Sequence, residues 1–218
     1  LGGLDLNITQ GEMNQINKYK KDVDGVTGKN TPNVTQYGLV HLDGTQATTY
    51  ARIRKLSGDD FKRASRQRIV LQAMLEKAKK ANPATLVKIC NSMVDDISTT
   101  LSLDQMVSLA KDVTKYKISS TTGFPTDLTT KNMPRCGDTV IPADLVTNVK
   151  KLHEYMFDDA RYTPSQTVQA ISDTIVNTTG ITADSAKINT SDYNETVGAT
   201  GTDEIQKGSE TTGGTNVQ

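Results

Sequence analysis

The sequence predicts an α/β fold, a layered α-β-α domain with a mixed central sheet, followed by a disordered tail. Short segments in which apolar and polar residues alternate, such as Leu4–Ile8, are typical of strands. They are interspersed with longer segments in which apolar residues recur every three or four positions, as in amphipathic helices. From Thr178 to Gln218 the chain is rich in Thr, Gly, Ser and Asn, and it cannot bury enough apolar surface to offset the entropy of ordering.

The composition supports a core of modest size. The 218 residues include 3 Phe, 7 Tyr and no Trp, the hydrophobic fraction is 35%, and the mean hydropathy is -0.48. These values predict a substantial unfolded portion beside the folded one. Lys plus Arg and Asp plus Glu each number 25, so the net charge of +0 does not indicate a nucleic-acid partner. No run approaches the roughly 20 apolar residues that span a bilayer.

The first predicted elements are a strand and a capped helix. Leu4–Ile8 is the strand. Thr9, followed three residues later by Glu12, forms a capping box, and this box opens a helix over residues 11–20. Residues 25–38 are rich in Gly, Asn, Thr and Pro, and this composition predicts a surface loop.

A second strand and a short helix lead into the middle of the chain. Gly38–Leu42 is the strand, and Asp43 with Gln46 caps a brief helix. The alternation in Tyr50–Arg54 then predicts another strand. A long helix over residues 60–81 follows, and its predicted inward face holds Leu71, Met74, Leu75 and Ala78.

Helices dominate the remainder of the predicted fold. Asn82 ends the long helix and caps the next, and Ser102 opens a third. Strands are predicted over residues 116–120 and 137–141, and two more helices begin at Asp144 and near Val168. The predicted organisation is a domain over residues 1–162, a short helical extension over 163–177 and a disordered tail over 178–218.

The most informative segment is Tyr50–Arg68, which holds seven basic residues against two aspartates, a local charge of +5. Such a run is typical of a solvated helix face, but also of a site for an anionic partner. In the predicted strand Arg52 and Arg54 share one face, and in the predicted helix Arg63 shares a surface with Arg66 and Gln67. Because arginine binds phosphate oxygens in pairs, this spacing predicts a convergent phosphate-binding pocket.

The cysteines and histidines give weaker signals. Cys90 and Cys136 are the two cysteines, and both a disulfide and two free thiols are compatible with the sequence. The sequence has no CxxC or HExxH spacing, so no zinc site is predicted. His41 on a strand and His153 on a helix surface are interpreted as structural.

Three blocks of sequence closely resemble the LytR-CpsA-Psr family of cell-envelope phosphotransferases from Gram-positive bacteria. They are Leu42-Asp43-Gly44-x-Gln46-Ala47, Tyr50-x-Arg52-x-Arg54 and Gly58-Asp59-Asp60-Phe61-x-Arg63-x-x-Arg66-Gln67, and they occur in the order of the family. Weaker similarity extends upstream to Leu1–Asp5 and downstream to Tyr162–Ser165. The resemblance covers roughly the first three quarters of the chain, with soft boundaries.

The resemblance implies a reaction and a set of site residues. A glycopolymer of the wall teichoic acid or capsular polysaccharide type, linked through pyrophosphate to a polyprenyl lipid, is transferred as a phosphodiester onto peptidoglycan. The matched positions make Arg52, Arg54 and Arg63 the catalytic residues. The substrate-binding residues implied by the match are Arg52, Arg54, Asp60, Arg63, Arg66 and Gln67. Asp60 would orient an arginine, Arg66 has a structural ion pair as its alternative role, and Lys55, Lys62 and Arg68 are expected to be solvated.

The resemblance also implies a cofactor and a location. The family uses Mg²⁺, and we expect the metal ligands upstream of Leu1, so no residue of this chain, Asp59 and Asp60 included, is assigned as a ligand. The chain is interpreted as the C-terminal part of the catalytic domain, with membrane attachment through a helix upstream. The expected location is the outer face of the cell membrane or the cell wall of a Gram-positive bacterium.

Two alternatives come from other functional classes. The first is a non-catalytic module that binds the cell wall or a polyanion. The second is a transcriptional attenuator that binds nucleic acid, an old label of the family. The sequence disfavours the second, because it has no helix-turn-helix signature, no aromatic residues interleaved with the basic run and no overall basic charge.

Overall fold

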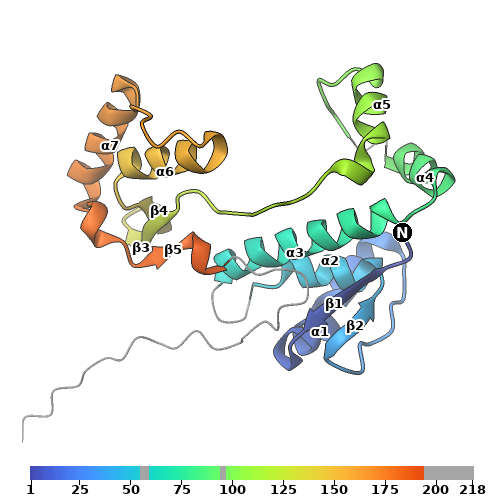
Figure 1. The fold of residues 1–218 in the computed structure, drawn as a ribbon. Helices are drawn as coiled ribbons and strands as arrows, with labels where there is room; N and C mark the ends of the chain where they lie inside the picture. The colour runs from blue at the N-terminus through green and yellow to red at the C-terminus, as the bar shows by residue number, and fades with distance from the viewer. Residues whose placement is uncertain (55–58, 94–96, 194–218) are drawn as a thin grey trace, which may run out of the picture. The chain divides into compact units, whose positions relative to one another are not determined.

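The computed structural model describes residues 1–54, 59–93 and 97–193, drawn in colour in Figure 1. The described residues divide into an N-terminal unit, residues 1–117, and a C-terminal unit, residues 118–193. This division lies well before the boundary near residue 162 that the sequence suggested.

The sheet of the N-terminal unit pairs β1 (Leu4–Ile8) with β2 (Gly38–Leu42) in antiparallel register, so that Leu6 lies opposite Val40. Both strands were predicted and are confirmed. Along β1 the apolar residues Leu4, Leu6 and Ile8 are buried and Asp5 is exposed, which is the period-2 pattern of a strand with one face in a core. The same alternation that predicted the strand therefore fixes which face packs inward.

The helix α1 (Gln10–Thr27) begins with the predicted capping box. The backbone N–H of Glu12 donates to the Thr9 hydroxyl at 3.1 Å, and the Thr9 N–H donates to the Glu12 carboxylate at 3.0 Å. The helix runs farther than the predicted residues 11–20 and ends at Gly28, whose φ of 68° is a left-handed conformation that glycine adopts without strain. Ile16 on its inward face is fully buried.

Side chains of α1 hold the loop that follows it. The amide of Asn17 both accepts from the Val34 N–H and donates to the Val34 carbonyl, each at 2.8 Å. The carboxylate of Asp24 accepts from the N–H and the hydroxyl of Thr31, and the Lys20 ammonium donates to the Thr31 carbonyl. These bonds satisfy the backbone of a loop that has no strand partner.

The helix α2 (Gly44–Arg52) has the predicted cap, in which Asp43 and Gln46 bond each other's backbone at 2.9 Å. The predicted strand at Tyr50–Arg54 is wrong, because α2 continues through Arg52. Tyr50 and Ile53 lie three residues apart and are 2% and 3% exposed. Helical spacing brings both into the core, whereas the strand prediction rested on a five-residue alternation that a helix end also allows.

The long helix α3 (Asp59–Lys79) is confirmed close to its predicted bounds, but its predicted inward face is wrong at Leu71 and Met74. Leu71 is 60% exposed and Met74 is 39% exposed. The helix instead buries a face that mixes polar with apolar residues: Lys62, Ser65, Arg66, Ile69 and Ala73. Polar residues on a buried face break the apolar periodicity on which the prediction relied.

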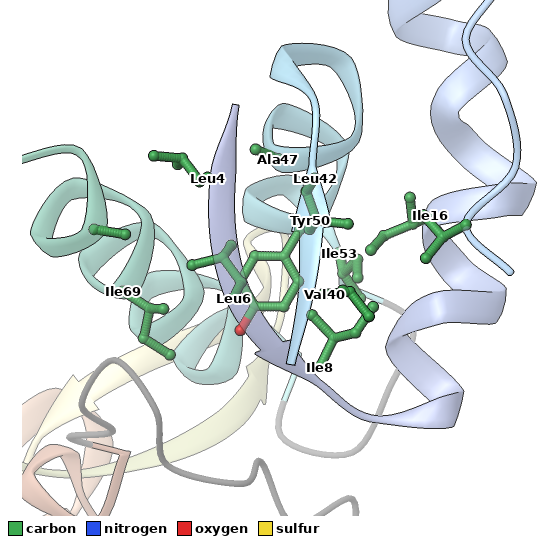
Figure 2. Close-up of a cluster of buried hydrophobic side chains, with 12 residues drawn as sticks. Leu4, Leu6, Ile8, Ile16, Val40, Leu42, Ala47, Tyr50, Ile53 and Ile69 are labelled. Atoms are coloured by element: carbon green, nitrogen blue, oxygen red, sulfur yellow. The ribbon is translucent and has the colours of Figure 1, made fainter. Parts of the chain in front are cut away.

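One cluster of buried side chains joins these elements, and Figure 2 shows it at close range. Tyr50 from α2 lies among residues of the two strands, and Ile69 of α3 belongs to the same cluster. The cluster consists of Leu4, Leu6, Ile8, Ile16, Val34, Val40, Leu42, Ala47, Tyr50, Ile53, Ile69 and Ala73. Burial of this set fixes how α1, α2 and α3 pack around the β1–β2 pair.

The N-terminal unit ends in three short helices: α4 (Pro83–Met93), α5 (Leu103–Lys111) and the 3-10 helix η2 (Val113–Lys115). The predicted starts are confirmed, since the Asn82 side chain accepts from the Thr85 N–H at 2.8 Å, and Ser102 and Gln105 cap each other. The predicted strand over residues 116–120 does not form.

The sheet of the C-terminal unit has the antiparallel order β4-β3-β5. Its strands are β3 (Asp127–Met133), β4 (Gly137–Pro142) and β5 (Ile188–Asn189). Only β4 was predicted. No strand was predicted at β3, because its sequence is polar and its pairing with β4 and β5 is not visible in its own residues.

Two helices complete this unit, α6 (Leu145–Phe157) and α7 (Gln166–Thr179). Asp144 caps α6 and Ser165 caps α7, as the expected helix starts required. The short 3-10 helices η3 (Ala183–Ser185) and η4 (Thr190–Tyr193) flank β5. Residues 178–193 were predicted to belong to the disordered tail, but they have defined structure. Residues 194–218 lie outside the described residues.

The predicted α/β class is confirmed, because both units combine helices with sheet. The sheets differ from the predicted form. The described residues make two small antiparallel sheets in place of one mixed central sheet. In Figure 1 the helices α1, α2 and α3 lie beside the β1–β2 pair.

Candidate functional site

The candidate site lies in the N-terminal unit, where the end of α2 is followed by the start of α3. Arg52 is the last residue of α2, and Arg54 follows the buried Ile53. Asp60 and Arg63 belong to the first turns of α3. Lys55, expected to be solvated, falls in the segment 55–58, outside the described residues. The site is thus carried on two helix ends, not on a strand and a helix as predicted.

A single carboxylate connects two of the predicted arginines. One oxygen of Asp60, Oδ2, accepts from Arg54 Nη2 at 2.8 Å, and the other, Oδ1, is 3.1 Å from Arg63 Nη2. The three side chains are 59%, 50% and 34% exposed, in the order Arg54, Asp60 and Arg63. The carboxylate therefore holds both guanidinium groups in position at the surface while each keeps further N–H donors for a ligand.

Arg52 differs from these two because it has no such partner. It is exposed and forms no hydrogen bond or ion pair with the described part of the chain. Gln67 is also exposed, four residues after Arg63 and hence on the same side of α3. An unpaired arginine next to two braced ones is suited to an anionic ligand with several oxygens.

Arg66 occupies a different environment, with its side chain only 5% exposed. Its Nε donates to Glu12 Oε1 at 2.6 Å, and its Nη1 lies 3.4 Å from the carbonyl oxygen of Ile53. The structural ion pair, which the sequence left open as one role of Arg66, is what the structure shows. Its partner Glu12 was predicted only as a capping residue.

Two further basic residues were expected to be solvated. For Lys62 the expectation is wrong, because this residue is 8% exposed and lies on the inward face of α3. Arg68 is half-buried. Both belong to a helix whose inward face includes polar side chains, so their charge alone did not reveal their position.

A cavity of about 190 Å³ adjoins the arginines. One wall is the face of α1 with Tyr19, Asp22 and Val23, and the other is the end of α2 with Thr49, Arg52 and Ile53, while Arg54 completes the lining. Tyr19, Asp22 and Thr49 were not among the predicted site residues. Their spacing could have indicated them. Residues 19, 22 and 23, and likewise residues 49, 52 and 53, follow the i, i+3, i+4 pattern of a single helix face.

The sequence model of the LytR_cpsA_psr family matches residues 1–151. The chain belongs to this family. The match contains every predicted site residue and most of the resemblance noted above, although Tyr162–Ser165 lies beyond it. A comparison with curated proteins found no match to the chain. Membership of the LytR_cpsA_psr family supports a general role in the transfer of glycopolymers at the cell envelope.

The family resemblance implies Mg²⁺, and the described residues of this member do not supply a site for it. Among them no group of three or more His, Cys, Asp or Glu side chains could hold a metal ion. His41 is engaged with Asp5, at 2.7 Å between Nδ1 and Oδ1, and the ring of His153 stacks on Tyr162. Asp60, the acidic residue of the candidate site, is committed to two arginines.

The described residues also include a free thiol and a second cavity. Cys136 is a free, exposed thiol, and the side chain of Cys90 lies outside the described residues. No helix in the described part is long and apolar enough to cross a membrane. A larger cavity of about 640 Å³ lies between β1 and α3, and its lining, which includes Asp5 and Lys77, contains none of the predicted site residues.

Proposed function

We propose that the full-length protein transfers a polyprenyl-pyrophosphate-linked glycopolymer, of the wall teichoic acid or capsular polysaccharide type, onto peptidoglycan as a phosphodiester. The reaction takes place on the outer face of a Gram-positive cell membrane, to which an upstream helix attaches the protein. The general role in glycopolymer transfer rests on the family. The substrate, the reaction and the site residues are the proposal.

The observation that carries the proposal is the arrangement of three arginines around one carboxylate and one cavity. Arg54 and Arg63 are held by Asp60, and Arg52 lines the cavity and has no ion pair within the described residues. In the reaction the acceptor hydroxyl oxygen bonds to the phosphorus next to the glycopolymer. The bridging P–O bond of the pyrophosphate breaks, polyprenyl monophosphate leaves, and the proton of the acceptor hydroxyl passes to water. Negative charge on the phosphate oxygens is what fixed guanidinium groups stabilise.

The three arginines have distinct roles in this proposal. Arg52, which has no hydrogen bond or ion pair with the described residues, binds the pyrophosphate directly. Arg54 and Arg63 each use one Nη2 for Asp60 and have other N–H groups to donate to phosphate. Gln67 adds an amide donor from the same side of α3. Arg66 contributes by holding the helices together, because its guanidinium is buried against Glu12.

Magnesium dependence of the full-length protein is part of the proposal, with ligands upstream of Leu1. The described residues do not form a metal site. None of the roles given to the arginines depends on the ion.

The test is to replace Arg52 or Arg63 by alanine in the full-length protein and to measure transfer of a radiolabelled glycopolymer from its polyprenyl pyrophosphate to peptidoglycan. We expect the rate to fall about 100-fold or more, the loss seen when a donor that stabilises developing charge is removed. Arg161→Ala, an exposed arginine of the C-terminal unit, is the matched control and is expected to retain activity. Transfer at the wild-type rate by both Arg52→Ala and Arg63→Ala would refute the site.

A further inference from the structure

The cavity beside the arginines is formed by two helix faces. On α1, Tyr19, Asp22 and Val23 lie at positions i, i+3 and i+4, so they project from one side of the helix. On α2, which packs against α1, Thr49, Arg52 and Ile53 repeat the same spacing. The cavity is therefore a property of how α1 and α2 pack, and it opens next to the guanidinium groups of the proposed phosphate site.

The cavity presents two opposite charges that do not neutralise each other. Asp22 and Arg52 both line it, yet they form no ion pair, and neither forms a hydrogen bond with the described part of the chain. The hydroxyl of Thr49 donates to the Thr45 carbonyl at 2.8 Å, so its proton is already used within α2. The Asp22 carboxylate and the Arg52 guanidinium are thus charged groups on these two helix faces that a ligand can use.

The size and the remaining lining restrict the ligand further. Val23 and Ile53 are buried and supply the apolar part of the lining, called the apolar floor below. The ring of Tyr19 also belongs to the lining. The volume of about 190 Å³ is below the roughly 300–1,000 Å³ of pockets for drug-sized ligands. One six-membered ring fits such a space, whereas an oligosaccharide does not. The charged rim disfavours a polyprenyl chain, because an apolar chain would strip water from Asp22 and Arg52 without replacing its hydrogen bonds.

We propose that this cavity binds the single sugar ring that is attached to the pyrophosphate of the donor substrate. This inference rests on the proposed function and assigns a substrate group to a part of the site with no assigned role. The sugar hydroxyls donate to the Asp22 carboxylate, which can only accept, and the less polar face of the ring lies against Tyr19 and the apolar floor. Arg52 stands where this ring meets the phosphates on Arg54 and Arg63.

The test compares two ligands on the full-length protein by calorimetry. One is farnesyl pyrophosphate, which has no sugar, and the other is a farnesyl pyrophosphate that carries glucose, galactose or N-acetylglucosamine on its terminal phosphate. We expect a sugar-bearing ligand to bind more tightly than the sugar-free one. Asp22→Asn should weaken that sugar-bearing ligand about tenfold, the usual cost of losing a charged hydrogen-bond acceptor, and leave farnesyl pyrophosphate unchanged. Arg52→Ala should weaken both.

A matched control and the remaining outcomes decide between the two proposals. Asp173→Asn makes the same charge change at an exposed position of α7 and should affect neither ligand. Equal affinity for the two kinds of ligand in the wild type, or an equal loss for both in Asp22→Asn, would overturn the sugar site while the phosphate site stands. Failure of the wild type to bind farnesyl pyrophosphate at all would overturn the proposed function, and the sugar site with it.

Discussion

Arg66 and Glu12 lie 54 residues apart in the sequence and form a buried ion pair between α3 and α1, with 2.6 Å between Nε and Oε1. The other carboxylate oxygen of Glu12 accepts from the Thr9 N–H in the cap of α1. The same guanidinium reaches the carbonyl of Ile53, directly between Arg52 and Arg54. One pair of side chains thus connects the start of α1, the end of α2 and the body of α3, and it supports the backbone that carries two of the proposed catalytic arginines.

Breaking this pair is expected to unfold the N-terminal unit more readily. Arg66→Ala leaves the Glu12 carboxylate buried without a cation, and Glu12→Ala leaves the guanidinium in the same condition. Each should lower the free energy of unfolding by about 3–5 kcal/mol, as measured by urea denaturation. The double variant Glu12→Leu/Arg66→Met should be more stable than either single variant, because no unpaired charge remains. A loss below about 1 kcal/mol in both single variants, typical of surface pairs, would contradict the structural role.

The ion pairs of Asp60 differ from the buried Glu12–Arg66 pair, because they are half exposed and contribute little to the free energy of unfolding. Asp60→Ala should change the free energy of unfolding by less than about 1 kcal/mol. It should leave the affinity for the pyrophosphate substrate undiminished, since a competing negative charge is removed. The rate of transfer at saturating substrate should nevertheless fall by roughly tenfold to a hundredfold, because Arg54 and Arg63 lose the contact that orients them. Steady-state kinetics separate kcat from KM, and an unchanged kcat would contradict the positioning role.

The elements that the sequence predicted well are those decided by contacts within a few residues. The Thr9–Glu12 and Asp43–Gln46 capping boxes span three residues each, and the structure has both. The strands β1 and β2 were recognised from their own alternation. Spacing and resemblance placed Arg54 and Arg63 in one predicted site, and in the structure both contact the carboxylate of Asp60.

The misjudged elements depend on partners that are distant in sequence. Tyr50–Arg54 alternates over five residues, and only the packing of Tyr50 and Ile53 into the same core shows that α2 continues. The inward face of α3 includes Arg66, which is tolerated in the interior because Glu12 neutralises it. Nothing in the residues around Arg66 reveals a partner on another helix. The strand β3 was missed for the same reason, since its polar residues become a strand through pairing with β4 and β5.

Asn148 in the C-terminal unit is expected to be more sensitive than an ordinary polar residue. It is 0% exposed, accepts from the Asp127 N–H at 2.9 Å and donates to the carbonyls of Asp127, Ala143 and Asp144. Asn148→Ala removes all four of these hydrogen bonds from a fully buried position, so we expect a loss of about 3 kcal/mol in the stability of this unit. Faster amide hydrogen exchange in α6 would show the loss. Asn132→Ala, at an exposed position of β3, is the control, and equal effects of the two substitutions would contradict the prediction.

Asp144 joins α6 to α7 and gives the C-terminal unit a dependence on acid. Its Oδ2 accepts from the Thr147 N–H at 3.0 Å and from the Thr147 hydroxyl, and its Oδ1 accepts from the Ser172 hydroxyl at 2.8 Å. Burial by itself would raise the pKa of Asp144. The hydrogen bonds from Thr147 and Ser172 outweigh that effect together and hold the pKa below its usual value of 3.8.

The sign of the pH effect follows from this lowered pKa. The ionised carboxylate stabilises the unit at every pH above the unfolded pKa of about 3.9, and this stabilisation is lost as the pH falls through the lower, folded pKa. We therefore expect hydrogen exchange in α6, corrected for its intrinsic pH dependence, to accelerate below about pH 4 in the wild type. Asp144→Asn should be less stable at pH 6 and should lack most of this acid-dependent change. Asp5 and Asp24, whose pKa values are also lowered, by hydrogen bonds from His41 and Thr31, lie in the N-terminal unit and do not affect a measurement confined to α6. An identical acid response of α6 in wild type and Asp144→Asn would show that Asp144 does not control it.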